Sequence, residues 1–355
     1  MRRTSFVLQS LTPGRTMSVD GQLMTTSTRW LVIALIVAVA VAVAGAIVWD
    51  HRSVTPGARI FVANYKDDTV SVIDMALERE VEVLKMPDSP FALTVCAAKP
   101  SPLVAVSNST ASRVTFIDAT SLEIVGTATV SKGPEFVACS PDGTRLYATS
   151  PYDKTISIVD VAARAPAGKP IAFERKPGAI AVAPDGRRLY VLMRDEDGAV
   201  LALNAATGAV EATAAVGKFP SDMAVSADGS RIVAASFDDS TVTVVDTASF
   251  KVLGTYPLAT GTGLLLHPYK PLVYSMVGFE DAVAVLDYET GKEIASFECS
   301  KGPTYSAITR DGRYLYVVNE DSDNVVKLDT ETGKALLRIA VGEEPADAVI
   351  VEPLT

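Results

Sequence analysis

The sequence predicts an all-β fold, a seven-bladed β-propeller closed by its own C-terminal strand and preceded by one N-terminal transmembrane helix. The first observation is a short hydrophobic strand that recurs seven times with 41 to 44 residues between copies, at VSVID, VTFID, ISIVD, VLALN, VTVVD, VAVLD and VVKLD. A period of this length built only from short strands is typical of propeller blades. The other two observations are an uncharged run near the N-terminus and the phase of the repeats at the two ends of the ring.

Residues 30–49, WLVIALIVAVAVAVAGAIVW, are the first expected element, a transmembrane signal anchor. Twenty uncharged residues make a helix of about 30 Å, enough to cross a bilayer. A Trp at each end suits the membrane interfaces, and the arginines upstream keep residues 1–29 in the cytoplasm. Residues 50–58 are then a linker, and residues 59–355 form a propeller in the periplasm or at the cell surface. The alternative is a signal peptide cleaved near Ala44-Gly45-Ala46, which leaves the same propeller secreted.

Each repeat divides into four strands joined by characteristic turns. One unit runs from GPEFVACSPDG at residues 133–143 through TRLYATS and ISIVD to an outer strand such as VEATAAV. The PDG piece suits a tight turn, because Pro fixes one dihedral angle and Gly permits a positive φ. Short TG hairpins join the last two strands. LLLHPYK at residues 264–270 lacks the PDG turn, so we expect an irregular sixth blade.

The phase of the repeats predicts how the ring closes. The propeller opens on a second strand at Arg59 and ends on an unpartnered inner strand at residues 346–353. We therefore expect the last strand to complete the first blade, which covers edges that would otherwise be exposed.

The repeats resemble those of the YVTN, or surface-layer type, β-propeller family. The resemblance rests on LYVVN at residues 315–319, IFVAN at 60–64, LYATS at 146–150 and the connectors VGEEP and VGKFP, and it covers residues 59–353. It implies an extracytoplasmic propeller and no particular activity. The fold is also similar to the haem d1 domain of nitrite reductase and to the heavy chain of amine dehydrogenases, which implies an enzyme or cofactor-handling propeller as an alternative function. Similarity to certain periplasmic propellers implies nucleic-acid binding as a second alternative.

The negative charge of the propeller argues against nucleic acid as a partner. The chain has a formal charge of -10, and its first 57 residues carry five arginines against two aspartates, or +3, which leaves -13 on the propeller. An acidic surface opposes nonspecific binding to nucleic acid or anionic lipid, which requires basic residues to neutralise phosphates.

The sequence offers little catalytic or metal-binding chemistry. It contains no GxSxG, Walker or Rossmann motif, and its two histidines, His51 and His267, lie far apart. We expect His267 to be a surface turn residue. Acidic loops such as DED at residues 195–197 and DSDN at 321–324 lack the spacing of calcium loops and are expected to be solvated turns. We therefore expect no catalytic residue, no metal and no cofactor.

The three cysteines have plain explanations in the repeat alignment. Cys139 and Cys299 occupy positions that hold Val in other repeats, so we expect both to be small apolar core residues. Cys96 follows the equivalent core position by one residue. A disulfide from Cys96 to Cys139 between neighbouring blades is the alternative.

Basic residues recur in the connectors that lead from the outer strand of one blade to the inner strand of the next. Because these connectors share a face with the acidic loops between second and third strands, we expect an inner basic arc within an acidic rim. The first explanation of this pattern is a set of exposed salt bridges that keep the face soluble, and the other is a funnel for a small anionic or mixed-charge ligand. The candidate ligand-binding residues are Lys132, Glu135, Lys218, Asp222, Lys301, Tyr305 and Asp347. The expected function is a membrane-anchored, non-catalytic binding or scaffolding module for a protein or a small anionic ligand on this face.

Overall fold

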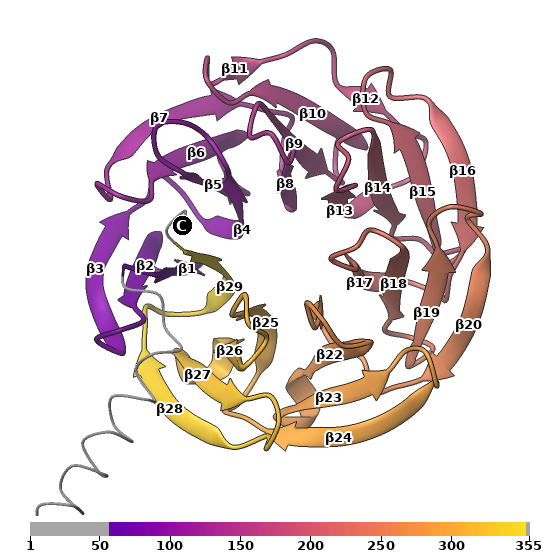
Figure 1. Ribbon diagram of the computed structural model, residues 1–355. Coiled ribbons are helices and arrows are strands. Elements are labelled where there is room, and N and C mark those ends of the chain that lie inside the picture. Colours follow the sequence, from indigo (N-terminus) through magenta and orange to yellow (C-terminus); the bar gives the residue numbers. More distant parts are fainter. Residues whose placement is uncertain (1–56, 353–355) are drawn as a thin grey trace, which may run out of the picture. The chain divides into compact units, whose positions relative to one another are not determined.

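The computed structural model describes residues 57–352, and these residues form a ring of seven antiparallel sheets, as Figure 1 shows. The predicted seven-bladed propeller is confirmed. Six sheets have four strands, and in every sheet the strands run in order from the axis to the outside. Each blade is a run of consecutive strands, except that the first blade takes its inner strand from the C-terminal end of the chain.

The strands fall into four concentric sets. The inner strands are β29 (Pro345–Val351), β4 (Pro90–Cys96), β8 (Val137–Cys139), β13 (Pro177–Val182), β17 (Pro220–Val225), β21 (Leu264–Leu266) and β25 (Pro303–Ile308). The second strands are β1 (Arg59–Asn64), β5 (Leu103–Asn108), β9 (Arg145–Ser150), β14 (Arg188–Met193), β18 (Arg231–Ser236), β22 (Leu272–Val277) and β26 (Tyr314–Asn319). The third strands are β2 (Thr69–Asp74), β6 (Arg113–Asp118), β10 (Thr155–Asp160), β15 (Ala199–Asn204), β19 (Thr241–Asp246), β23 (Ala282–Asp287) and β27 (Asn324–Asp329). The outer strands are β3 (Arg79–Lys85), β7 (Ile124–Thr129), β11 (Ala165–Pro166) with β12 (Ile171–Ala172), β16 (Val210–Ala215), β20 (Val252–Pro257), β24 (Lys292–Glu298) and β28 (Ala335–Ala340). Two 3-10 turns, η2 (Gly278–Glu280) and η3 (Glu320–Ser322), lie in loops between second and third strands.

The hydrophobic core lies between the faces of adjacent blades. All six residues of β5 and of β26 are buried, whereas β7, β20 and β28 are largely exposed. One core cluster joins Tyr274 of the sixth blade to Leu315 of the seventh. Side chains that alternate along a strand reach both faces of a blade, so each blade packs against two neighbours.

The acidic residue that ends each third strand caps the following hairpin. Asp74 Oδ1 accepts hydrogen bonds from the backbone N–H groups of Ala76 and Leu77, both at 2.9 Å. The equivalent side-chain oxygen accepts backbone N–H groups in the other six blades, at Asp118, Asp160, Asn204, Asp246, Asp287 and Asp329. The most regular residue of the repeat is therefore a turn cap, which Asp and Asn suit because their short side chains reach backbone groups two or three residues ahead.

The C-terminal strand closes the ring as predicted. β29 pairs with β1 in an antiparallel register that sets Arg59 opposite Val351. A partly buried ion pair reinforces the seam between the last and first blades. Lys327 Nζ donates to Glu78 Oε1 at 2.7 Å and lies 4.1 Å from the centroid of the Tyr314 ring. The Lys327 side chain is 8% exposed, so its charge depends on these partners.

Two blades depart from the regular pattern. The sixth blade is irregular as predicted, because β21 has only three residues. The third blade is also irregular, which the repeat pattern did not indicate. Its inner strand β8 has three residues, and its outer edge is split into β11 and β12. Pro166 and Pro170 lie in and after β11, and a proline has no N–H to donate to a strand ladder, so a continuous outer strand is interrupted.

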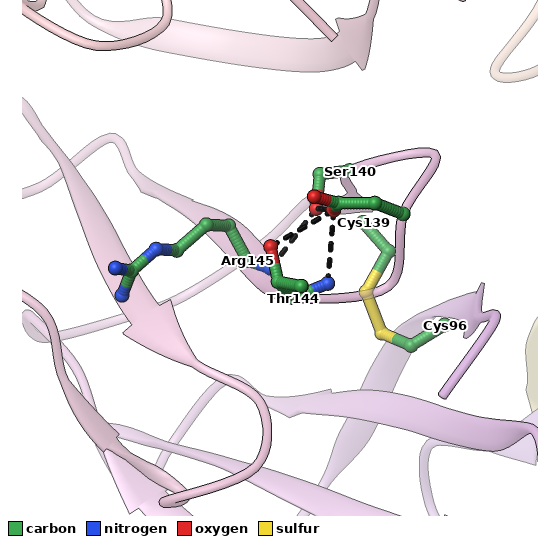
Figure 2. The surroundings of a disulfide bond; sticks show 6 residues. Cys96, Cys139, Ser140, Thr144 and Arg145 are labelled. Atoms are coloured by element: carbon green, nitrogen blue, oxygen red, sulfur yellow. Dashed lines mark hydrogen bonds between the residues drawn. A yellow bond between two sulfur atoms is a disulfide. The ribbon is translucent and has the colours of Figure 1, made fainter. Parts of the chain in front are cut away.

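A disulfide joins Cys96 at the end of β4 to Cys139 at the end of β8, with Cα atoms 5.3 Å apart (Figure 2). The expectation that Cys139 is only an apolar core residue is therefore wrong, because the last residues of two neighbouring inner strands meet at this point. The turn beside it is ordered by Ser140 Oγ, which accepts the N–H of Arg145 at 2.9 Å. Cys299 is partly buried among hydrophobic side chains, in line with the expectation for it, and burial raises the pKa of its thiol to about 11.

The expected transmembrane segment at residues 30–49 lies outside the described residues. Between residues 57 and 352, no helix is long and apolar enough to cross a bilayer.

Candidate functional site

The connectors between blades and the loops between second and third strands form one face of the ring, here called the connector face. Acidic loop residues bind the connectors directly. Backbone N–H groups of Lys132 and Lys218 donate to the carboxylates of Asp153 and Asp239, both at 2.8 Å. The N–H of Glu343 donates to Asp67 Oδ2 at 2.7 Å. Part of the predicted acidic rim is therefore structural, since it fixes the path of the connectors.

Lys132, Lys218 and Lys301 each present an exposed side chain on this face. Within residues 57–352, no carboxylate lies within ion-pair distance of their ammonium groups. Lys66 and Arg175 on the same face do form ion pairs, with Glu343 at 3.1 Å and Asp195 at 2.8 Å. Exposed salt bridges thus account for Lys66 and Arg175. They leave Lys132, Lys218 and Lys301, together with Lys176 on the connector before β13, without an ion pair in this part of the chain.

Asp222 lies in the inner ring and joins two blades. Its Oδ1 accepts the N–H of Met223, and its Oδ2 accepts the N–H of Leu264 in the next blade, both at 2.8 Å. The residue is only 7% exposed. Burial raises the pKa of Asp222 to about 7, against the opposing effect of the two N–H donors.

Asp347 repeats this arrangement at the closing seam. Its Oδ1 accepts the N–H of Ala348, and its Oδ2 accepts the N–H of Leu93 in the second blade, again at 2.8 Å. Burial raises the pKa of Asp347 to about 7 as well. Both carboxylates therefore clamp one blade to the next, and each oxygen already has a donor.

Tyr305, on the inner strand β25, lies near these two carboxylates. Burial, together with the charges of Asp222 and Asp347, raises its pKa well above the usual value, so the phenol stays neutral. Its ring is 6.4 Å from that of Phe136, which belongs to a blade across the axis. Gly263 leaves room for this arrangement, since a Cβ there would lie 2.8 Å from the Tyr305 ring.

Arg194, which the sequence analysis missed, is the cation at the channel mouth. It follows β14, and its Nη1 donates to Glu135 Oε2 at 2.7 Å. Its guanidinium carbon lies 5.9 Å from the centroid of the Phe136 ring. Burial raises the pKa of Glu135, and the Arg194 charge opposes this shift. Gly178 leaves room for the Arg194 side chain, since a Cβ there would overlap Arg194 Cδ.

The structure thus separates the seven candidate residues into two groups. Asp222, Tyr305 and Asp347 lie on the inner strands β17, β25 and β29, and Glu135 lies just before the inner strand β8, so these four residues form an inner group near the axis. The three lysines lie outside this group, one on each of three connectors. The carboxylates of the mouth are all engaged by donors within the protein, so the charges left for a ligand are mainly positive.

His267 occupies a turn, as expected, but it is 6% exposed rather than a surface residue. Its Nδ1 accepts the N–H groups of Tyr269 and Lys270, both at 3.0 Å. Burial lowers its pKa, so the imidazole is neutral at pH 7. In the described part of the chain, no group of three or more His, Cys, Asp or Glu residues is arranged to hold a metal ion.

Comparison with known proteins matches the fold throughout its length. The model of the family described as YNCE-like β-propeller matches residues 24–352. No curated protein sequence matches the chain.

Three similar solved structures illustrate how widely the fold is shared. Hydrazine synthase of Kuenenia stuttgartiensis has a TM-score of 0.65 at 20% identity, over 73% of this chain and 88% of that one. Dihydro-haem d1 dehydrogenase NirN, in complex with DHE, has a TM-score of 0.60 at 16% identity, over 83% and 75%. A functionally unknown protein from Desulfotomaculum acetoxidans has a TM-score of 0.72 at 14% identity, over 83% and 99%. Identities this low show a common fold alone.

Proposed function

This chain belongs to the YNCE-like β-propeller family, and from that premise we propose that it is an exported, non-catalytic module that binds a small anionic ligand or an acidic partner on its connector face. The observation that carries the proposal is the imbalance of charge on this face. Three exposed lysines have no carboxylate partner among residues 57–352, whereas the carboxylates at the mouth are occupied by backbone N–H groups or by Arg194. An anion is the ligand that such a surface attracts.

The export of the propeller is part of the same proposal. The disulfide between Cys96 and Cys139 supports it, because disulfides persist mainly in oxidising compartments such as the periplasm. Residues 30–49 have the length and composition of a signal anchor, and a cleaved signal peptide leads to the same compartment. The YVTN-type character of the repeats, including the Asn that ends β1, β5 and β26, agrees with an extracytoplasmic module.

An enzymatic or cofactor-handling role is the alternative, because one similar structure is named as a haem d1 dehydrogenase in complex with DHE. The residues here do not fit an iron ligand set of histidines at the channel mouth. His267 belongs to an inter-strand turn, and its Nδ1 accepts two backbone N–H groups. Visible absorbance of the purified protein would support this alternative.

Nucleic-acid binding is the second alternative. The formal charge of -13 on the propeller opposes it, and the unpaired lysines on the connectors favour it. Binding of DNA that weakens steeply with salt would be its signature.

Capture from membranes tests the proposal. The wild-type chain and the variant K132E/K218E/K301E are purified side by side, and retained molecules are identified by mass spectrometry. The proposal predicts an anionic molecule or an acidic protein that is retained by the wild type and lost from the variant. Equal retention by both proteins would contradict it.

A further inference from the structure

Arg194 separates two pockets on the connector face. One pocket, of about 220 Å³, is lined by Glu135, Tyr152 and Lys176 together with Arg194. The other, of about 310 Å³, is lined by Phe219 and Phe237 together with the same arginine. The first pocket is charged and the second is largely apolar. Small-molecule sites measure roughly 300–1,000 Å³, so the first pocket alone is too small, the second is at the lower end, and the two together fall within the range.

The charged pocket has more positive than negative charge. Glu135 is its one carboxylate, and it accepts a hydrogen bond from Arg194 at 2.7 Å. Lys176 is exposed, acts on the pKa of Glu135 through its charge, and has no ion pair within the described chain. A guanidinium has five N–H donors, so Arg194 can hold Glu135 and still donate to a second acid.

The apolar pocket contains a side chain in an unfavourable backbone conformation. Phe219 has a φ of 40° and is 47% exposed. The corresponding residues of three other connectors, Gly133, Gly302 and Glu344, also adopt a positive φ, which is 50° at Glu344. A positive φ is thus shared by several connectors, and Phe219 differs from its counterparts by exposing a large aromatic ring in this strained conformation. Phe237, 51% exposed, stands across the same pocket.

We propose that the two pockets form one site for a small amphipathic anion. Its flat apolar part lies between Phe219 and Phe237, and its acidic group lies against Arg194 and Lys176. This inference rests on the proposed function and narrows its ligand class from anions in general to anions that carry an aromatic or similar apolar group. The aromatic side chains stabilise the apolar part of the ligand, and Arg194 makes binding depend on a negative charge in the ligand.

Fluorescent probes test the site. The anionic probe is 8-anilinonaphthalene-1-sulfonate, and the uncharged probe is N-phenyl-1-naphthylamine, which has the same rings without the sulfonate. For the anionic probe we expect one saturable site on the wild-type chain, at least tenfold weaker binding to R194Q, and partial recovery in R194K. For the uncharged probe we expect weaker binding to F237A and an unchanged affinity for R194Q.

Two further variants separate binding from folding. F219G removes the strained aromatic ring, so we expect a melting temperature equal to or above that of the wild type and at least fivefold weaker binding of both probes. Y269A removes a residue that is 71% exposed on the opposite face, and we expect it to bind both probes like the wild type.

Several outcomes would overturn the inference. These are no saturable binding to the wild type, equal affinity of the anionic probe for wild type and R194Q, or equal losses in Y269A and F237A. Stronger binding of an oligothymidylate than of the anionic probe would favour nucleic acid instead. Pyrophosphate has no apolar part, so its binding tests the positive charge of the face without the aromatic pocket. If pyrophosphate binding depends on Lys132, Lys218 and Lys301 while the probe results fail, the proposed function stands and this inference falls.

Discussion

At the scale of single residues, Asp222 and Asp347 show how the inner ring combines structure with charge. Each carboxylate accepts one backbone N–H from its own strand and one from the next blade. Burial raises the pKa of each to about 7. Since the unfolded chain has these groups near their ordinary values, the folded protein binds protons that the unfolded protein lacks between about pH 4 and 7.

The sign of this linkage predicts a stability that falls as pH rises. Between about pH 4 and 7, each carboxyl with a raised pKa lowers the free energy of unfolding by up to about 1.4 kcal/mol for every unit of increasing pH. The stabilisation that its proton gives at low pH is therefore lost as the pH rises through 7. In D222N, the amide oxygen can still accept the Leu264 N–H but no longer titrates. We expect chemical denaturation of D222N to show a shallower decrease in stability between pH 5 and 8.

The control for this experiment is D228N. Hydrogen bonds from Ser226 and Ser230 lower the pKa of the exposed Asp228 to about 2, so its linkage lies in the acid range. D228N should retain the wild-type slope between pH 5 and 8. A D222N slope equal to that of the wild type would contradict a titrating Asp222.

Single residues also show which features of the site could be predicted from the sequence and which could not. The repeat alignment placed Asp222, Tyr305 and Asp347 near the channel mouth, because their positions follow directly from the phase of the inner strands. It did not find Arg194, whose role depends on a contact with Glu135 in another blade. It also assigned Cys139 to the core, because comparison along the chain does not show that two inner strands end side by side.

At the scale of elements, the C-terminal strand is the piece that closes the ring. β29 supplies the inner strand of the first blade, and its Asp347 holds the second blade. A chain that lacks residues 345–355 exposes the edge of β1 and loses this clamp. We expect a loss of more than about 4 kcal/mol in unfolding free energy, seen as a large drop in melting temperature or as failure to fold. A truncated protein with the same melting temperature as the full-length protein would contradict this prediction.

The disulfide is a second device that joins elements. It links β4 to β8 across a separation of 43 residues. Closing a loop of this length stabilises a fold by roughly 2–4 kcal/mol, because it restricts the unfolded chain. We expect a reducing agent to lower the melting temperature of the wild type and to leave that of C96A/C139A unchanged. Equal responses to the reductant would show that the bond does not form in solution.

The third and sixth blades show where the local sequence pattern predicts the structure and where it does not. The missing PDG turn correctly indicated irregularity in the sixth blade. In the third blade the usual turn is present, yet β8 is short and the outer edge is split. The prolines after β10 carry this information, but they act through a missing hydrogen-bond donor rather than through the hydrophobic period.

At the scale of the whole molecule, seven equivalent blades place chemically different residues around one axis. The fold was predictable because each repeat carries its own strand pattern, turn and cap, and these local signals agree. The candidate site was predictable only as a face, since connectors and loops must share a side of the ring. Which charges on that face are free follows from partners in other blades, and these are visible only in three dimensions.

We expect the free positive charge of the connector face to bind anions. Isothermal titration with pyrophosphate at low ionic strength, where electrostatic attraction is least screened, measures this binding. The test variant is K132E/K218E/K301E. The control is K251E/K292E/K334E, which changes the formal charge equally at exposed lysines of the hairpins between third and outer strands. We predict at least tenfold weaker binding, about 1.4 kcal/mol, for the first variant and less than threefold for the second. Equal affinities in both variants, or equal losses, would contradict this expectation.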